Sequence, residues 1–397
     1  MTGIDELLAQ VHDEVIDWRR HLHRNPEPSF HEEETARFVR ETLGSFPDVE
    51  VSLPTPTSVM GRLRGGQPGQ VLAIRADMDA LPIQEENDFE FASQRAGVMH
   101  ACGHDAHTAM LLATAKVLSG SREQLPGEVR LLFQHAEELY PGGAEEMIEA
   151  GVMDGVDVVI GAHIWSPLEV GKIGIVHGPA MAAPDTFWIT IHGKGGHAAL
   201  PHQTVDPIVV GAQVVTSLQH IVSRATDPLS TVVVSVTQFV AGTTHNVIPG
   251  AVQMQGTVRT FEPALRARIP ELMERHVKGV TAAHGATYEF KYQYGYRVVV
   301  NEPRVTGVVE DTVREALGES AVETMKPNMG GEDFSAFQER APGSFFFIGA
   351  GNPGKGIVHP HHHPRFTVDE DALALGVEVF VNAAARLLSP QAREVRR

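Results

Sequence analysis

Apolar positions recur along the chain with two different spacings, which separate predicted helices from predicted strands. Apolar stripes with helical periodicity cover residues 4–24, 33–43 and 104–118. Short apolar runs, typical of buried strands, cover residues 71–76, 129–134 and 156–160. Helices that alternate with buried strands predict an α/β fold, in which a central mixed or parallel sheet is flanked by helices.

Polar side chains follow each of these three predicted strands. Asp77 comes at the end of the first strand, Glu137 and Glu138 come after the second, and His163 comes after the third. Because sites in α/β sheets form at the carboxyl ends of the strands, we expect these side chains to belong to one site.

A different pattern begins after a composition shift near residues 178–184. Alternating strands are predicted at residues 187–192, 231–236 and 252–258, and helices at residues 205–222 and 264–284. The segment 181–294 is therefore predicted to be an inserted, ferredoxin-like α+β domain. It divides a larger catalytic domain into residues 1–180 and 295–397, and the second of these parts contains a strand at 344–349 and a final helix at 369–388.

Composition narrows the possible partners. The 397 residues include 32 basic and 50 acidic side chains, a formal net charge of −18, which argues against nucleic acid and anionic membranes as partners. No apolar run approaches the roughly 20 residues of a membrane span, and the first residues do not resemble a secretory signal. A single cysteine gives no disulfide framework and fits a reducing compartment, so a cytoplasmic location is expected.

The segment 100–107, His-Ala-Cys-Gly-His-Asp-Ala-His, carries the clearest chemical signal. Cys102 and His104 are separated by one residue, so both can reach one metal ion, and a thiolate with an imidazole suits a zinc-like metal. The alternative is a buried, inert thiol. His100 and His107 are expected to support the site rather than to bind metal.

The pair Glu137–Glu138 offers two different functions at one place. Neighbouring side chains are expected to point apart, so one carboxylate can bind metal while the other acts as general base on the substrate water. Such a pair on its own is more often a solvated helix start. His163 is either a metal ligand or a buried core histidine, and the histidines at 359–363 are either ligands or a solvated loop.

The inserted segment contains a glycine-rich motif at residues 193–202 that includes His197. Glycines allow a backbone to approach a ligand closely, but the pattern of a phosphate-binding loop is absent. Further polar groups beside predicted strands are residues 243–249, Arg259 and residues 329–334. Each of these alone is typical of a plain loop.

Nine short motifs follow one another over nearly the whole chain, at residues 18–27, 75–82, 99–108, 136–138, 161–163, 195–202, 245–249, 331–334 and 362–366. In this order and spacing they resemble the metal-dependent amidohydrolases that include hippurate hydrolase, N-acyl-amino-acid amidohydrolases and auxin-conjugate hydrolases. That family belongs to the aminoacylase and carboxypeptidase clan. The resemblance implies hydrolysis of the amide bond of a small N-acyl amino acid.

The resemblance also implies a centre with two divalent metal ions, zinc or manganese, with cobalt or nickel as further options. The implied ligands are Cys102, His104, Glu138, His163 and His362. His361 and His363 flank the last of these and are the alternatives to it. Glu137 falls on the general base and acid, and Asp77 on a supporting carboxylate. Arg75 replaces a histidine of the wider clan, which points to the cysteine-containing amidohydrolase branch.

For the inserted domain, the resemblance implies a lid that closes over the substrate and mediates formation of a homodimer or higher homo-oligomer. His197 falls on the position that stabilises the oxyanion. Asn246 and Arg259 fall on positions that bind the acyl or carboxylate end, and an arginine fork suits a carboxylate.

Two other functions stay open from the sequence: a dipeptidase of the same chemistry, and a non-catalytic metal-binding protein on this fold. A zinc nucleobase deaminase is disfavoured, because its Pro-Cys-x-x-Cys element needs two cysteines.

Overall fold

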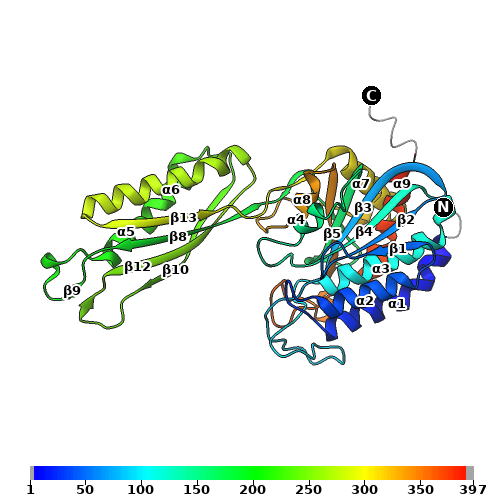
Figure 1. Ribbon diagram of the computed structural model, residues 1–397, viewed down its shortest axis with the longest axis horizontal. Helices are drawn as coiled ribbons and strands as arrows, with labels where there is room; N and C mark the ends of the chain where they lie inside the picture. The colour runs from blue at the N-terminus through cyan, green and yellow to red at the C-terminus, as the bar shows by residue number, and fades with distance from the viewer. Residues whose placement is uncertain (1–3, 390–397) are drawn as a thin grey trace. The chain divides into compact units, whose positions relative to one another are not determined.

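The computed structural model describes residues 4–389, which form two compact units (Figure 1). The first unit comprises residues up to Ala180, Val299–Pro327 and residues from Asp333 onward, and the second comprises Met181–Val298 and Asn328–Glu332. No helix within residues 4–389 combines the length and apolar character that a membrane crossing requires.

The first unit is built on an eight-stranded mixed sheet. In spatial order its strands are β1 (Val49–Ser52), β2 (Val59–Arg64), β4 (Pro126–Gln134), β3 (Gln67–Asp77), β5 (Val158–Glu169), β16 (Gly343–Gly351), β6 (Ile173–Ile175) and β15 (Val322–Thr324). The four central strands β4, β3, β5 and β16 are parallel, and antiparallel pairs flank them on both sides. This arrangement confirms the predicted fold class.

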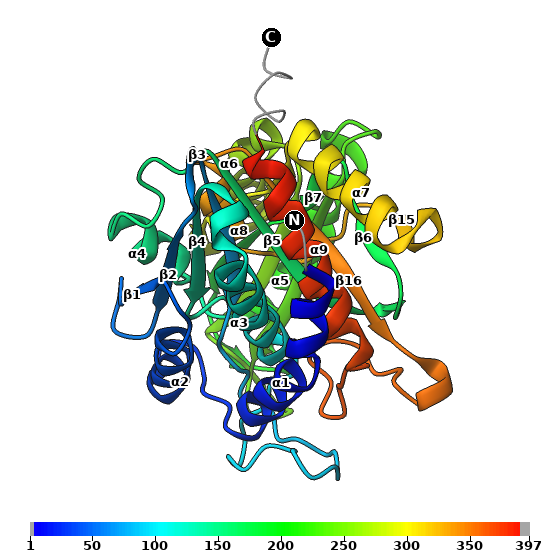
Figure 2. The same ribbon diagram turned by 90° about the vertical axis from the view of Figure 1, so that its right-hand side faces the viewer.

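Helices cover both faces of this sheet. They are α1 (Ile4–Arg24), α2 (Glu33–Gly44), α3 (His104–Gly120), α4 (Ala144–Glu149), α7 (Pro303–Leu317), α8 (Phe334–Gln338) and α9 (Asp371–Leu388). Figure 2 shows α1, α3 and α9 across one face. On β16, Phe346 packs against Phe380 of α9, whereas Phe345 packs against Phe334 of α8. Because both faces are covered, the whole of β16 is buried, which explains its continuous apolar run.

Two strands lie near the points where the chain leaves and re-enters the first unit. They are β7 (Gly178–Met181) and β14 (Val299–Asn301), which form a two-stranded sheet of their own. The predicted strand at 156–160 was too short, because β5 continues to Glu169. Gly161 does not break it: the rings of Phe334 and Phe345 fill the space where its side chain would lie.

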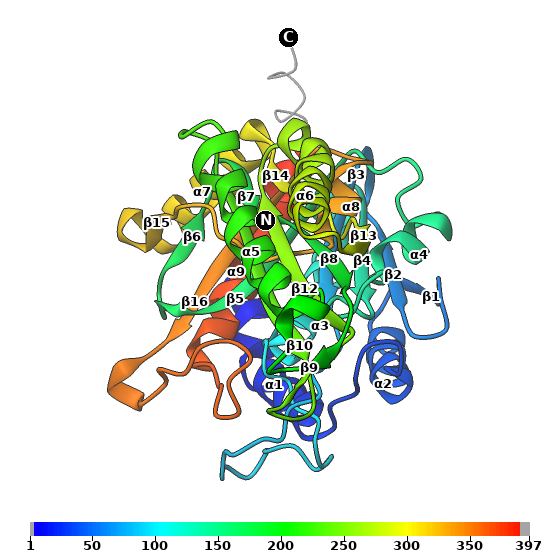
Figure 3. The ribbon, with the colours of Figure 1, turned by 90° about the vertical axis from the view of Figure 1, so that its left-hand side faces the viewer.

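The second unit has the order β-α-β-β-α-β of a ferredoxin-like fold. Its main elements are β8 (Ala183–His192), α5 (Pro207–His220), β10 (Val232–Ala241), β12 (Ala251–Thr260), α6 (Pro263–His284) and β13 (Thr287–Gln293). The sheet order is β10-β12-β8-β13, and every pair is antiparallel. Strand β8 alternates buried and half-buried residues, and its buried side chains share a core with those of α5 and α6. Figure 3 shows these two helices together with β8, β10 and β12. One face of this sheet is thus covered by helices.

Candidate metal centre

The parallel neighbours β4, β3 and β5 bring the predicted site residues to one edge of the sheet. Asp77 ends β3 and pairs with Gln134, which ends β4. On the other side of β3, Arg75 pairs with Gly161, two residues before His163 in β5. Side chains that are far apart in the sequence therefore lie level at the carboxyl ends of three strands.

The start of helix α3 brings two further predicted ligands to this edge, because the helix begins at His104, two residues after Cys102. The intervening Gly103 has a φ of 93°, a left-handed conformation that favours glycine. A Cβ atom on Gly103 would lie 2.4 Å from Cγ2 of Ile164. Glycine is therefore required here both by the turn and by the close approach of β5.

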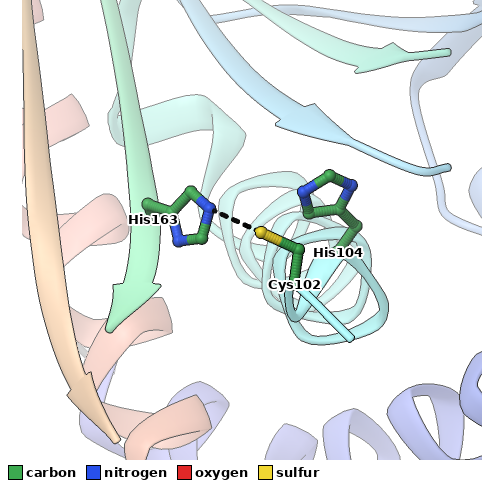
Figure 4. Close-up of side chains that lie close together, drawn as sticks. All are labelled: Cys102, His104 and His163. Atoms are coloured by element: carbon green, nitrogen blue, oxygen red, sulfur yellow. Dashed lines mark hydrogen bonds between the residues drawn. The ribbon is translucent and has the colours of Figure 1, made fainter. Parts of the chain in front are cut away.

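Cys102, His104 and His163 lie close together at this edge (Figure 4). The Sγ atom of Cys102 is 3.4 Å from Nε2 of His163. One possible ligand atom from each of the three lies within 4.8 Å of the others. Three further groups within the same limit share a member with this one: Cys102 with Glu138 and His362, His104 with Glu137 and Glu138, and His104 with Asp77 and His107. The predicted residues thus form one cluster of thiol, imidazole and carboxylate donors.

Hydrogen bonds fix which nitrogen of each histidine is available to a metal. Nδ1 of His163 donates to the carbonyl oxygen of Ile164 at 2.6 Å, and Nδ1 of His104 donates to Oδ1 of Asp79 at 3.1 Å. In its neutral form each ring therefore has its lone pair on Nε2, the form that a metal-binding histidine needs. Nε2 of His104 and Oε1 of Glu138 are buried and make no hydrogen bond within residues 4–389, although they lie 4.0 Å apart and Oε1 also forms an ion-pair contact with His362. A divalent cation fits these donors, because it would satisfy both atoms.

The three adjacent histidines near the C-terminus have different surroundings. Nε2 of His362 lies 3.2 Å from Oε1 of Glu138. Nε2 of His361 accepts a backbone amide, so its Nδ1 carries the proton and faces Sγ of Cys102 at 3.9 Å as a donor. His363 stacks on another loop histidine. These contacts favour His362 as the ligand over both of its neighbours.

Neighbouring carboxylates shift the pKa values of two of the proposed ligands, His104 and Cys102. Burial alone would lower the pKa of His104, but the neighbouring carboxylates, with Asp77 foremost, raise it to about 10. Burial raises the pKa of the Cys102 thiol well above its ordinary value, and Glu138 and Glu137 raise it further. A bound cation would reverse both effects, because it favours the thiolate and the neutral imidazole.

A fully buried network holds Asp77 in place. Its carboxylate accepts hydrogen bonds from Nδ1 of His107 at 2.5 Å and from Nη1 of Arg75 at 2.7 Å. Arg75 also donates to Gln134 at 2.8 Å and to Asp333 at 2.8 Å. Burial alone would raise the pKa of Asp77, but the neighbouring histidines and Arg75 hold it well below its usual range. His107 donates to Asp77, and its ring also contacts the rings of His104 and His163.

The prediction that the side chains of Glu137 and Glu138 point apart is wrong. Ala136 has a φ of 51°, so the backbone leaves the extended conformation just before the pair. One carboxylate oxygen of each residue then lies within 4.8 Å of the other and of a ring nitrogen of His104. Both carboxylates can therefore act at the same place.

Sequence reasoning did not single out Asp79, Ser29 or Glu32. Asp79 and Glu32 accept backbone amides of the turn at Ala136–Glu138, Asp79 also accepts Nδ1 of His104, and Ser29 donates to Asp79. Asp79 lies within the 75–82 motif, so a second carboxylate two residues after Asp77 was the available signal. Ser29 and Glu32 carried none, because their side chains reach the site only through the tertiary fold.

The predicted substrate-binding residues all lie in the second unit. His197 is in β9 (Gly196–His197) and pairs with Val247 of β11 (Val247–Ile248), which directly follows Asn246. This pairing places His197 and Asn246 side by side. Arg259 of β12 donates to the carbonyl oxygen of Met329 at 3.2 Å, and burial lowers its pKa.

The glycines of the 193–202 motif have a structural explanation within this unit. A Cβ atom on Gly193 would lie 2.1 Å from the carbonyl oxygen of Val205, and one on Gly195 would lie 2.7 Å from that of Ile248. The backbone therefore passes too close to its neighbours for any larger residue.

The fold and the donor cluster together define a metal-binding hydrolase. Residues 73–386 match the model of peptidase family M20/M25/M40, and the chain belongs to this family. It is 70% identical over 298 residues to an N-acyl-L-amino acid amidohydrolase of Geobacillus stearothermophilus, covering 75% of this chain and 80% of that protein. It is 45% identical over 373 residues to thermostable carboxypeptidase 2 of Saccharolobus solfataricus, covering 93% and 94%.

A solved structure agrees with these matches. The Bacillus subtilis YXEP protein, described as a dinuclear metal-binding peptidase of family M20, superposes with a TM-score of 0.82 at 38% identity. The alignment covers 96% of this chain and 99% of that one. The predicted class, a metal-dependent amidohydrolase that cleaves a carbon–nitrogen bond, is confirmed at this level.

Proposed function

We propose that this protein hydrolyses the amide bond of small N-acyl amino acids with the help of two divalent metal ions. The residues proposed to hold the metals are Cys102, His104, Glu138, His163 and His362. The observation that carries the proposal is the pair of buried atoms without hydrogen-bond partners within residues 4–389, Nε2 of His104 and Oε1 of Glu138, inside this cluster. The donor set suits zinc or manganese, and cobalt or nickel as well.

Glu137 is proposed to move the proton. The amide bond breaks when a water oxygen bonds to the carbonyl carbon and the leaving nitrogen takes up a proton. Glu137 would accept the proton of the water and pass it to the nitrogen, which releases a carboxylic acid and a free amino acid. Bound cations would polarise the carbonyl group and lower the pKa of the water. Asp77 would support the site through its bonds to His107 and Arg75.

Glu137→Gln tests this assignment. Because the amide cannot take a proton, we expect kcat to fall by about 10²–10⁴-fold, while metal content measured by atomic emission stays unchanged. Glu149→Gln, at the exposed end of α4, is the matched control and is expected to keep full activity. Unchanged turnover of Glu137→Gln would remove it as the base, and loss of metal would make it a ligand.

A peptidase is the second candidate, favoured by the 45% identity to a protein named as a carboxypeptidase. Metal-stripped protein would be restored separately with zinc, manganese, cobalt or nickel. It would then be given N-acetyl, N-benzoyl and indole-acetyl amino acids, with dipeptides alongside. Release of amino acid from the acyl compounds supports the proposed substrate, and release from dipeptides alone supports the peptidase. Metal binding without any release supports a non-catalytic protein.

We further propose that the segment 181–294 is a lid and dimerisation domain of a cytoplasmic homo-oligomer. In this proposal His197 stabilises the oxyanion, and Asn246 and Arg259 bind the acyl or carboxylate end. Their common location in the second unit supports a shared role. Light scattering tests the assembly, since a mass of one chain in solution would contradict it.

A further inference from the structure

Asp79 makes contact with several parts of the candidate centre through a single carboxylate. Oδ1 accepts the backbone amide of Glu137 at 3.1 Å and Nδ1 of His104 at 3.1 Å. Oδ2 accepts the backbone amide of Glu138 at 3.0 Å and the hydroxyl of Ser29 at 2.6 Å. The Asp79 side chain is completely buried, and all four of its partners are donors. Each oxygen therefore has two hydrogen bonds and no unused capacity.

The turn that Asp79 holds has few other means of support. It follows the end of β4 and contains Ala136 in a left-handed conformation, φ 51°, which a non-glycine residue adopts at a cost. The backbone amide of Ala136 donates to Oε1 of Glu32 at 2.7 Å. Three consecutive amides, those of the buried residues Ala136 and Glu137 and of the half-buried Glu138, thus all donate to carboxyl groups from other parts of the chain. Left without these acceptors, they would carry a large desolvation penalty.

We propose that Asp79 is a positioning residue that couples the metal-binding His104 to the Glu137–Glu138 turn. This role rests on the proposed function, because it assumes that His104 and Glu138 hold metal and that Glu137 is the base. The carboxylate fixes the ring of His104 with its Nε2 lone pair toward the donor cluster. The same carboxylate sets the position of the base and the carboxylate ligand relative to that ring.

Asp79→Asn is the sharpest perturbation, because it keeps the shape and changes one acceptor into a donor. The hydroxyl of Ser29 can rotate and accept a hydrogen bond from the new amide group. The backbone N–H groups of Glu137 and Glu138 can only donate. Whichever way the new amide group turns, the N–H of Glu137 or of Glu138 faces another N–H group. We therefore expect the turn to shift and His104 to lose part of its orientation, even though the fold is retained.

The experiment measures metal retention and turnover separately on the full-length protein. Competition with a chelator gives the zinc and manganese affinity, which we expect to fall by about 10–100-fold in Asp79→Asn. With metal at saturation, we expect kcat on N-acetyl amino acids to fall by about 10–100-fold and KM to change little. The visible spectrum of the cobalt-loaded protein should also change, which reports ligand geometry without turnover.

Two further variants keep the result interpretable. Asp157→Asn is the matched control: Asp157 accepts the backbone amide of Val71, in the middle of β3 and six residues before Asp77, and its loss should leave affinity and kcat unchanged. Ser29→Ala removes one bond to Asp79 and covers the case in which Asp79→Asn does not fold. It should lower metal affinity and kcat in the same direction by about two- to tenfold.

The outcomes separate the two proposals. Unchanged affinity, spectrum and kcat in both site variants would overturn the role of Asp79. Weaker metal binding with wild-type kcat at saturating metal would overturn the coupling to Glu137. If the unmodified protein binds metal but releases no amino acid from any acyl compound, the proposed substrate fails, while the affinity and spectral measurements still decide the role of Asp79.

Discussion

Arg75 offers a stability prediction whose size follows from its contacts. Its side chain is completely buried and donates to the carboxylates of Asp77 and Asp333 and to the amide oxygen of Gln134. Arg75→Met keeps most of the volume but removes these bonds. Two carboxylates then remain in the interior without their cation, a situation that burial makes expensive.

The expected cost is about 3–5 kcal/mol, the usual range when one partner of a buried ion pair is removed. At roughly 2 °C for each kcal/mol in a large domain, the melting temperature should fall by about 6–10 °C. Burial raises the pKa of Asp333 to about 6 even though Arg75 lowers it. Adding Asp333→Asn to Arg75→Met should therefore recover part of the loss, because one uncompensated charge disappears.

The assay is thermal unfolding of the metal-free protein at pH 7.5, measured by calorimetry. Arg64→Met is the control, since the Arg64–Glu50 pair has side chains 55% and 58% exposed and such pairs contribute about 0–1 kcal/mol. A melting temperature of Arg75→Met within about 2 °C of the unmodified protein would refute the reasoning, and so would an equal shift in both variants.

Two further predictions concern the turn and the buried carboxyls around the centre. Gly103→Ala should lower the free energy of unfolding by about 1–3 kcal/mol and weaken metal retention, because the new Cβ meets Ile164 in a left-handed turn. The control, Gly307→Ala, lies in open space on α7 and should raise stability slightly. Equal melting temperatures of the two variants would contradict this. Burial, helped by Asp79, raises the pKa of Glu32 from 4.5 to about 8, so the folded protein keeps a proton that the unfolded chain loses, and stability falls as pH rises from about 4.5 to about 8. Glu32→Gln should remove that loss, and parallel melting curves between pH 6 and pH 9 in both proteins would argue against it.

Much of the fold could be predicted because long periodic segments carry a strong signal. The predicted helix 4–24 matches α1 in both bounds, and residues 104–118 lie within α3. Short elements were harder, since β1 and the three-residue β6 are strands only through their pairing with neighbours. The end of β5 was misplaced because residues 161–165 are a strand through their pairing with β16, which is far away in the sequence.

The site shows the same division between local signal and tertiary contact. Cys102 and His104 could be predicted as a pair because their spacing and chemistry are local. The geometry at Glu138 could not, because the positive φ of Ala136 has no signature in a non-glycine residue. Nor could the sequence reveal Asp79 as an acceptor of both turn amides, since that depends on β3 and β4 being parallel neighbours.

The place of β16 in the sheet has a consequence for synthesis of the protein. This strand lies between β5 and β6, yet it is made about 180 residues after β5. At ribosomal rates of about 5–20 residues per second, β5 waits some 10–35 s for its partner. During that time one edge of β5 is unpaired, although the first seven residues of this strand are buried in the folded protein. An unpaired strand edge is a site where chains can aggregate. This edge of β5 therefore stays without its partner until β16, which ends at Gly351, has been synthesised.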